Sequence, residues 1–386
     1  MERVPIDHLP DSSSKRLVLA AQLAFLPTGI LTTLLGPMLP LLMVRWSLSD
    51  TQAGNLFLVQ FLSSLVGVQL TGFLLSRLGF RPSFLLGLLL MACGTATLYL
   101  GSVALGMASV AVYGLGLGLI IPTDNLLIAE ISPASRSGAV SLLNFFWGIG
   151  AVLCSVMVAW TAAHRALPFF LGSVSLLLML LAFAVRGLTF PPAATSKDRA
   201  PSWRELLRSP AIWLFAAVFF LYPGAETAVG GWIGTYVSRL GPREAAIAPL
   251  MPAFFWAALT LGRGLGTLFL SHVPEHRVLR AGFAAGSAGI VLMLLSSTLT
   301  GVIAGALITG LSYATLYPIT VARLSHRFGV AARSIGAIMF SLASIGPAII
   351  PWMVGITSQS TGSLRAGLAM PLAATVILFL IHLRDW

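Results

Sequence analysis

Twelve apolar segments of about 19 to 28 residues run through the 386-residue sequence and dominate what it can fold into. About 20 apolar residues in a helix cross the hydrocarbon core of a bilayer. Lipid offers no hydrogen-bond partners to a backbone, so such segments must be helices; barrel strands would be about half as long and alternate in polarity. We therefore expect an all-α polytopic membrane protein. The segments are residues 17–44, 54–75, 84–103, 106–129, 138–162, 167–185, 211–237, 247–270, 279–298, 301–322, 333–356 and 364–383.

Composition supports the same class. The chain is 57% hydrophobic and 9% charged, whereas soluble domains carry about 25% charged residues. Cys93 and Cys154 both lie in apolar segments and lack metal-ligand spacing. We expect no metal site, no cofactor and two packed thiols.

The distribution of Lys and Arg predicts the orientation in the membrane. With the N-terminus inside, 17 of the 23 basic residues fall on the inner side and 5 fall in the outer loops, namely Arg45, Arg165, Arg239, Arg243 and Arg365. We therefore expect both termini in the cytoplasm, in an inner or plasma membrane. The same bias accounts for the net charge of +11 without a nucleic-acid partner.

One long polar loop divides the chain. It runs over residues 186–210, contains Pro191-Pro192 and Lys197-Asp198-Arg199, and reads as a cytoplasmic linker with a surface helix at Trp203–Leu207. The expected organisation is a tail at 1–16, a six-helix bundle at 17–185, the linker at 186–210 and a second six-helix bundle at 211–386.

The two halves repeat with a constant offset of 196 residues. Gly114 and Pro122 match Gly310 and Pro318, Gly150 matches Gly346, Pro27 matches Pro223, and Arg81 matches Arg277. An even number of spans in each half gives both halves the same topology, so the repeats are parallel, about an axis along the membrane normal. Two such bundles facing each other predict a transporter with its site between them.

The loop after the second segment points to a family. It reads Gly72-Phe73-Leu74-Leu75-Ser76-Arg77-Leu78-Gly79-Phe80-Arg81 and resembles the signature loop of the major facilitator superfamily, G-x-x-x-D-R-x-G-R-R. Gly72, Arg77, Gly79 and Arg81 match, whereas Ser76 replaces the usual Asp. The resemblance covers essentially the whole chain. It implies twelve helices in two six-helix bundles, alternating access, and a cavity lined by the first, fourth, seventh and tenth spans.

A finer resemblance is to the fucose-permease-like branch, which includes many sugar–proton symporters. It rests on Gly36-Pro37-Met38-Leu39-Pro40, on Gly114 to Asn125, on Leu143 to Gly148, on Gly224 to Trp232 and on Gly262-Arg263. Fucose–proton symporters carry an Asp in span 1 and a Glu in span 4. Gly36 and Ile121 stand at those places here, so a fucose assignment is not supported.

Three charged residues lie within the apolar segments and away from the segment ends, and they are our candidates for proton coupling and gating: Glu226, Asp124 and Arg263. Such residues are costly in lipid and usually face a bundle interior or a wet cavity. Pro223 and several glycines surround Glu226, so the seventh span is expected to be a broken helix. Arg263 needs a partner, either Glu226 or Asp124. Asp124, after Pro122, could instead cap a broken helix.

Polar and aromatic side chains within the spans are candidates for substrate binding, although helix packing would explain each of them as well. Amides suit sugar hydroxyls, and aromatic rings stack on sugar rings. The candidates are Asn125, Asn144, Trp147, Gln60, Trp232, Tyr236, Trp256, Tyr313 and Tyr317.

These features predict a monomeric secondary active transporter that moves a small polar organic solute, such as a sugar, with protons across the lipid bilayer. A drug or metabolite exporter working by proton antiport, and an uncoupled facilitator, remain alternatives. The fifth span has Gly148 and Gly150 but lacks the Gly-Pro ending typical of such antiporters in this superfamily. No catalytic cluster or ATP-binding motif is found, so we expect no enzyme, and any energy source is an ion gradient.

Overall fold

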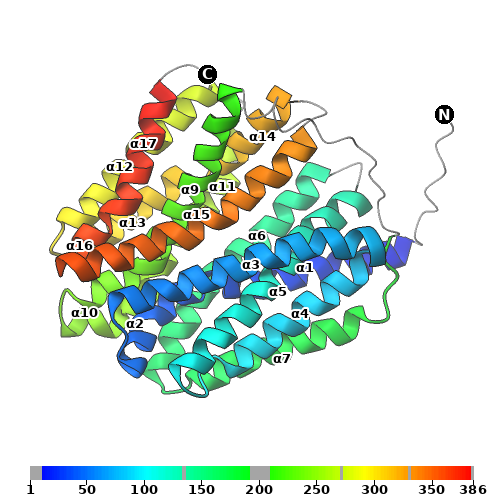
Figure 1. Ribbon diagram of the computed structural model, residues 1–386, viewed down its shortest axis with the longest axis horizontal. Helices are drawn as coiled ribbons and strands as arrows, with labels where there is room; N and C mark the ends of the chain where they lie inside the picture. Colours follow the sequence, from blue (N-terminus) through cyan, green and yellow to red (C-terminus); the bar gives the residue numbers. More distant parts are fainter. Residues whose placement is uncertain (1–10, 133–135, 192–208, 270–272, 329–331, 384–386) are drawn as a thin grey trace.

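The computed structural model describes residues 11–132, 136–191, 209–269, 273–328 and 332–383, and these contain helices and no strand (Figure 1). Most of the expected linker, with the surface helix expected at Trp203–Leu207, lies outside the described residues. The first half contains α1 (Asp11–Thr33), α2 (Leu35–Trp46), α3 (Asp50–Leu78), α4 (Phe80–Thr97), α5 (Val103–Ile131), α6 (Arg136–Ala163) and α7 (Leu167–Val185). The second half contains α9 (Pro210–Ser238), α10 (Pro242–Ile247), η2 (Ala248–Leu250), α11 (Met251–Phe269), α12 (Glu275–Leu295), α13 (Leu299–Tyr313), α14 (Leu316–Phe328), α15 (Ala332–Thr361), α16 (Leu364–Gly367) and α17 (Ala369–Leu383).

The described part of the chain holds twelve helical segments long and apolar enough to cross a membrane, which confirms the expected number. They form two bundles, α1 to α7 and α9 to α17 (Figure 1). We call them the N-bundle and the C-bundle. The prediction of an all-α, two-bundle membrane fold is confirmed.

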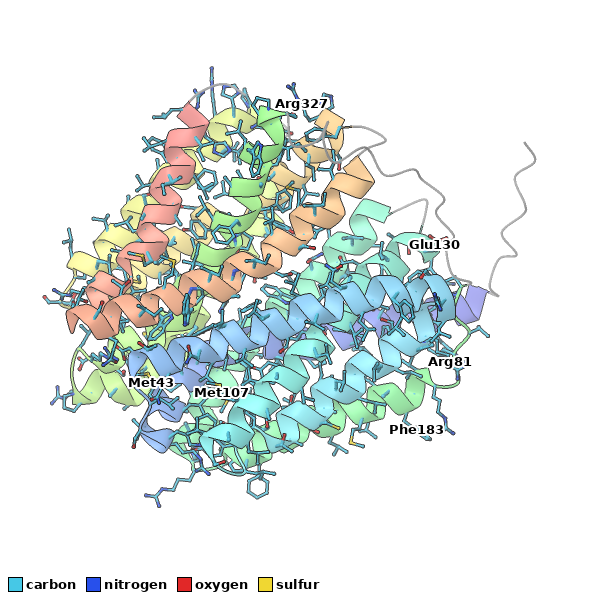
Figure 2. The ribbon with its side chains drawn as sticks, viewed as in Figure 1. Met43, Arg81, Met107, Glu130, Phe183 and Arg327 are labelled. Atoms are coloured by element: carbon cyan, nitrogen blue, oxygen red, sulfur yellow. The ribbon has the colours of Figure 1, made fainter. Side chains whose placement is uncertain are left out.

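The bundles touch at one end and diverge at the other. We call the end where α1 begins and α17 finishes the terminal end, and the opposite end the distal end. The bundles meet near α2 and α10 at the distal end (Figure 1). In Figure 2, Met43 lies near this junction, whereas Glu130 and Arg327 lie on the diverging ends of the two bundles. The distal end is therefore the closed side.

Two expected spans are interrupted by proline. The first breaks at Leu34, between α1 and α2, and the tenth breaks after Tyr313, between α13 and α14. Each break lies three to four residues before a proline, Pro37 or Pro318. Proline has no N–H to donate to the carbonyl four residues earlier, so the helix loses a hydrogen bond at that point.

The prediction that the seventh span is a broken helix was wrong, because α9 continues from Pro210 to Ser238 with Pro223 inside it. The glycines around Glu226 serve close packing. A Cβ atom on Gly224 would lie 2.8 Å from the carbonyl oxygen of Gly346 on α15, and one on Gly231 would lie 2.6 Å from the ring of Phe57 on α3. These glycines therefore bring α9 close to its neighbours.

The fourth span, α5, also continues through its proline. Pro122 cannot donate to the carbonyl of Gly118, and the Thr71 hydroxyl of α3 donates to that carbonyl at 3.2 Å instead. Because the helix does not end here, Asp124 does not act as a helix cap.

The internal repeat appears in the packing. Gly150 on α6 abuts the carbonyl of Leu26 on α1, and Gly346 on α15 abuts the carbonyl of Phe220 on α9. A side chain at either glycine would collide with the facing backbone. The paired glycines of the sequence repeat thus form equivalent helix contacts in the two bundles.

Candidate functional site

An ion pair lies near the middle of the C-bundle. Arg263 of α11 places Nη2 3.9 Å from Oε2 of Glu226 on α9, and the two side chains are 25% and 12% exposed. The sequence left Glu226 and Asp124 as possible partners, and the structure brings Glu226 to Arg263. At this distance the charges attract each other without a hydrogen bond.

Two tryptophans extend this site to the N-bundle. The Arg263 guanidinium lies 5.6 Å from the ring centroid of Trp147 on α6. Trp147 meets Trp256 of α11 edge to face, with ring centroids 5.6 Å apart. Trp147 belongs to the N-bundle and the other side chains belong to the C-bundle, so both halves contribute to one cluster. We call Glu226, Arg263, Trp147, Trp256 and Thr260 the central cluster.

Four buried polar atoms of the central cluster have no hydrogen-bond partner: Oε2 of Glu226, Nε1 of Trp256, Oγ1 of Thr260 and Nε of Arg263. Buried polar groups in folded proteins are almost always paired. Trp256, Thr260 and Arg263 follow one another at helical spacing and share a face of α11. The central cluster thus offers three donors and one carboxylate oxygen to a polar ligand.

The N-bundle positions Trp147 through a chain of hydrogen bonds. The Trp147 indole donates to the Thr32 hydroxyl at 3.4 Å, and Gln60 donates to the Thr32 carbonyl at 3.0 Å. Tyr113 then donates to the amide oxygen of Gln60 at 2.9 Å. Both polar atoms of the Gln60 side chain are engaged within the N-bundle, and this predicted binding residue supports the site rather than facing it.

Other predicted binding residues bond to their own helices or bundle. The Asn125 amide donates to the carbonyl of Ile121 at 2.9 Å, and the Asn144 amide donates to that of Val140 at 2.9 Å. The Trp232 indole is buried and donates to the carbonyl of Pro351.

The predicted tyrosines lie away from the central cluster or next to it. Tyr236 is buried near the distal end, where Arg365 donates to its hydroxyl. Tyr313 bonds Thr375 inside the C-bundle. Tyr317 stacks on Tyr222, one turn before Glu226, with centroids 6.1 Å apart. Tyr313 also contacts Tyr222, with ring centroids 5.3 Å apart, so both Tyr313 and Tyr317 connect to the central cluster through Tyr222.

Asp124 is separate from this cluster. It is fully buried in α5, and neither of its carboxylate oxygens has a hydrogen-bond partner. Burying a carboxyl group without a hydrogen-bond partner is energetically costly. The structure shows no described contact between it and Arg263.

The signature-loop residues hold the terminal end of the N-bundle. Gly79 takes φ 79° between α3 and α4, a conformation that favours glycine. Arg81 donates to the carbonyl of Arg186 after α7, and Figure 2 shows it at this end. Arg77 lies over the ring of Phe73, whereas Gly72 has open space around it. Within the described contacts, none of these four reaches the C-bundle.

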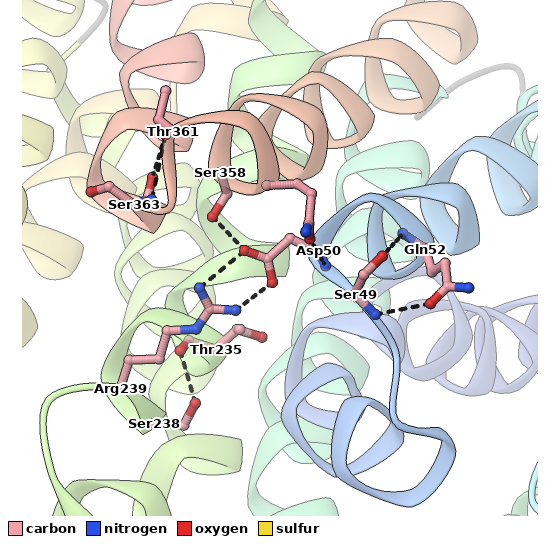
Figure 3. A network of polar contacts seen from close by, with 10 residues as sticks. Ser49, Asp50, Gln52, Thr235, Ser238, Arg239, Ser358, Thr361 and Ser363 are labelled. Atoms are coloured by element: carbon pink, nitrogen blue, oxygen red, sulfur yellow. Dashed lines mark hydrogen bonds and ion pairs between the residues drawn. The ribbon is translucent and has the colours of Figure 1, made fainter.

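A second polar network ties the bundles together at the distal end (Figure 3). Both terminal nitrogens of Arg239, after α9, bond the carboxylate of Asp50 at the start of α3. The Ser358 hydroxyl of α15 donates to the same carboxylate, and the Asp50 N–H donates to Gln359 at 3.1 Å. We call Asp50, Arg239, Ser358 and Gln359 the distal clasp.

Sequence reasoning missed Thr32, Thr260, Asp50 and Ser358. The spacing of Thr260 between Trp256 and Arg263 was a usable signal, because it places all three on one face. Asp50 and Arg239 read as loop charges, and no local pattern indicates a pairing across 189 residues.

Comparison with known proteins decides the family. The model of the Major Facilitator Superfamily matches residues 23–351. The chain belongs to this family. It is a major facilitator superfamily transporter, as the sequence resemblance predicted, and the family and fold are those of transporters rather than enzymes.

Among its relatives, the "Bypass of stop codon protein 6" of Saccharomyces cerevisiae is 25% identical over 331 residues, which are 76% of this chain and 64% of that protein. The "Glucose/galactose transporter" of Brucella abortus is 25% identical over 394 residues, covering 92% of this chain and 91% of that one. The crystal structure of the E. coli fucose:proton symporter matches with a TM-score of 0.67 at 18% identity, covering 96% of this chain and 98% of that one. This structural likeness shows a shared fold.

Proposed function

We propose that this major facilitator superfamily transporter is a proton-coupled symporter of a neutral, hydroxyl-rich solute of the sugar class. The observation that carries the proposal is the set of four unpartnered buried atoms in the central cluster, beside two tryptophan rings. Leaving such atoms unpaired is costly, so a ligand that pairs them gains affinity.

Sugar hydroxyls suit this set because each can both donate and accept a hydrogen bond. Nε1 of Trp256 and Nε of Arg263 require acceptors, Oε2 of Glu226 requires a donor when ionised, and the Thr260 hydroxyl takes either. The tryptophan rings supply apolar surface for the carbon face of a sugar ring. The names of the Brucella relative and of the fucose:proton symporter support the same class.

Glu226 is the proposed proton carrier. When it is ionised, the 3.9 Å pair with Arg263 is neutral overall. Adding a proton to its carboxylate removes that attraction, turns one oxygen into a hydroxyl donor and frees the guanidinium to bind the solute. Proton and solute thereby load together. On release, the proton leaves Glu226 and the ion pair re-forms.

The proposed orientation places the terminal end in the cytoplasm, as the excess of basic residues at that end supports. The distal clasp then faces outward, and the structure corresponds to an inward-facing conformation in a cytoplasmic membrane. Both bundles of one chain contribute to the central cluster, so a monomer suffices for transport.

The test uses the purified protein in liposomes, with radiolabelled glucose, galactose, xylose and fucose as probes. We expect at least one sugar to accumulate under an inward proton gradient and to stop accumulating when a protonophore collapses it. Sugar entry that only equilibrates in both conditions would indicate a facilitator. If instead amphipathic cations move against the proton gradient and sugars do not, the protein is an exporter.

A further inference from the structure

Tyr222 lies one helical turn before Glu226 on α9, so the two side chains share a face of that helix. The Tyr222 side chain is buried, and its ring contacts Tyr313 of α13 and Tyr317 of α14. The proposed transport cycle gives this tyrosine no role, although its hydroxyl group lies beside the proposed proton carrier.

The single proton of the Tyr222 hydroxyl is already used in a hydrogen bond. The hydroxyl oxygen lies 2.8 Å from the main-chain carbonyl oxygen of Tyr313. A carbonyl oxygen can only accept a hydrogen bond, so Tyr222 is the donor. This carbonyl belongs to the last residue of α13, beside the break that precedes Pro318, and carbonyls at helix ends need partners from outside the helix. Turning the hydroxyl away would deprive a buried carbonyl of this partner, which is costly.

The Tyr222 oxygen therefore offers only lone pairs to Glu226. The hydroxyl is within hydrogen-bond reach of the Glu226 carboxyl group. An ionised carboxylate also has only acceptor atoms, so the two groups repel each other. A protonated carboxyl group has an O–H that can donate to the Tyr222 oxygen. The arrangement is thus complementary to the protonated form of Glu226 and not to the ionised form.

The other groups that face Glu226 come from three neighbouring helices. Within the described part of the chain, Arg263 of α11 is the cation beside it, and a positive charge favours the ionised form of a carboxyl group. Tyr313 of α13 and Tyr317 of α14 lie near enough to interact with its charge. Arg263 and Tyr222 therefore favour opposite states of the same carboxyl group.

We propose that Tyr222 is a positioning residue that stabilises the protonated form of Glu226 by accepting a hydrogen bond from its carboxyl group. The inference rests on the proposed role of Glu226 as the proton carrier. Because Tyr222 opposes Arg263, it sets how acidic the medium must be for the carrier to take up its proton. Removing the Tyr222 oxygen makes the protonated form less favourable, so proton loading then requires a lower pH.

The test follows the protonation of Glu226 by infrared spectroscopy of the purified protein as the pH is varied. A carbonyl band of a protonated carboxyl group is assigned to Glu226 if it is absent from Glu226→Gln. In Tyr222→Phe we expect this band to reach half of its full intensity at a pH lower by about one unit, as for the loss of one hydrogen bond. The pH of half-maximal sugar uptake into liposomes should fall by the same amount.

The matched control is Tyr313→Phe. It removes another buried tyrosine hydroxyl, which bonds Thr375, but keeps the main-chain carbonyl that Tyr222 bonds. This variant should leave the half-intensity pH unchanged. A tyrosine fluorinated on its ring at position 222 keeps the shape of the residue and has a weaker acceptor oxygen. It should give a smaller shift in the same direction, and it replaces Tyr222→Phe if that variant does not fold.

Three results would overturn the inference: an unchanged or higher half-intensity pH in Tyr222→Phe, an equal shift in Tyr313→Phe, or no Glu226 band at any pH. The infrared measurement needs no solute, so it separates this inference from the proposed function. If the band shifts as expected but no sugar accumulates, Tyr222 has the assigned role and the symport proposal fails. If sugar accumulation depends on Glu226 but the band does not shift, the symport proposal stands and the role of Tyr222 is refuted.

Discussion

Arg263 and Glu226 face each other across 3.9 Å, too far for a hydrogen bond, while Nε of Arg263 and Oε2 of Glu226 have no other partner. The opposite charges attract each other, but no hydrogen bond joins the two side chains. A pair held in this way can be displaced by a ligand that offers shorter hydrogen bonds to both side chains.

Glu226→Gln should uncouple transport. The amide keeps the size of the side chain and can bond a hydroxyl but cannot carry a proton. We expect sugar exchange across the liposome membrane to persist and accumulation driven by a proton gradient to disappear. The matched control is Asp124→Asn, which changes the other buried acid. If accumulation survives in Glu226→Gln and disappears in Asp124→Asn, the proton carrier is Asp124.

Thr260→Val should weaken solute binding without affecting folding. Valine has nearly the same shape but lacks the hydroxyl, and one lost hydrogen bond costs about 1 kcal/mol, or about fivefold in KM. Thr260→Ser keeps the hydroxyl and should behave like the parent. Deoxy-sugars identify the partner, because the analogue lacking the bonded hydroxyl should transport equally well in the parent and in Thr260→Val. Equal KM values for the parent sugar in all three proteins would remove Thr260 from the site.

Arg263→Lys tests whether the site uses only the positive charge of Arg263 or also the planar arrangement of its N–H donors. Lysine keeps a positive charge near Glu226 but lacks the planar set of N–H donors. We expect solute affinity to fall by about tenfold, as for the loss of a hydrogen bond to a charged group, while proton dependence remains. Binding is read from ligand-induced stabilisation against heat. Parent-like affinity would show that only the charge of Arg263 is used.

Gln60→Leu should destabilise the protein more than it impairs binding. The change leaves the Tyr113 hydroxyl and the Thr32 carbonyl without their described partners, at a cost of about 1–3 kcal/mol for each buried group left unpaired. We expect a clearly lower Tm in detergent and only a small rise of KM in liposomes, because Thr32, which loses its Gln60 partner, also bonds the Trp147 indole. A large rise in KM at parent stability would instead make Gln60 a direct solute ligand.

The membrane-crossing pattern was predictable because each apolar segment must satisfy its backbone internally. The sequence predicted Glu226 or Asp124 as the partner of Arg263. Glu226 was a candidate because it and Arg263 lie deep in spans that follow each other in the sequence. The unbroken α9 was not predictable, because glycine and proline permit both a break and close packing, and only the neighbours Gly346 and Phe57 decide between them.

The bonding of Asn125, Asn144 and Gln60 was also beyond the sequence. An amide in a span can face a cavity or bond a nearby carbonyl, and the local pattern is the same in both cases. The distal clasp depends on how two separately packed bundles meet. The relative position of the bundles depends on many contacts over both surfaces. It cannot be predicted from the short sequence segments around Asp50 and Arg239.

Glu226 and Arg263 sit on the same bundle, so they travel as one body when the bundles rock against each other. With Glu226 ionised the travelling pair is electrically silent, whereas with Glu226 protonated and a neutral sugar bound it carries one positive charge. The membrane voltage, worth about 2.3 kcal/mol per charge per 100 mV, therefore acts on the loaded carrier and leaves the return of the empty one unaffected. Transport by this protein should be electrogenic, with its voltage dependence confined to a single half of the cycle.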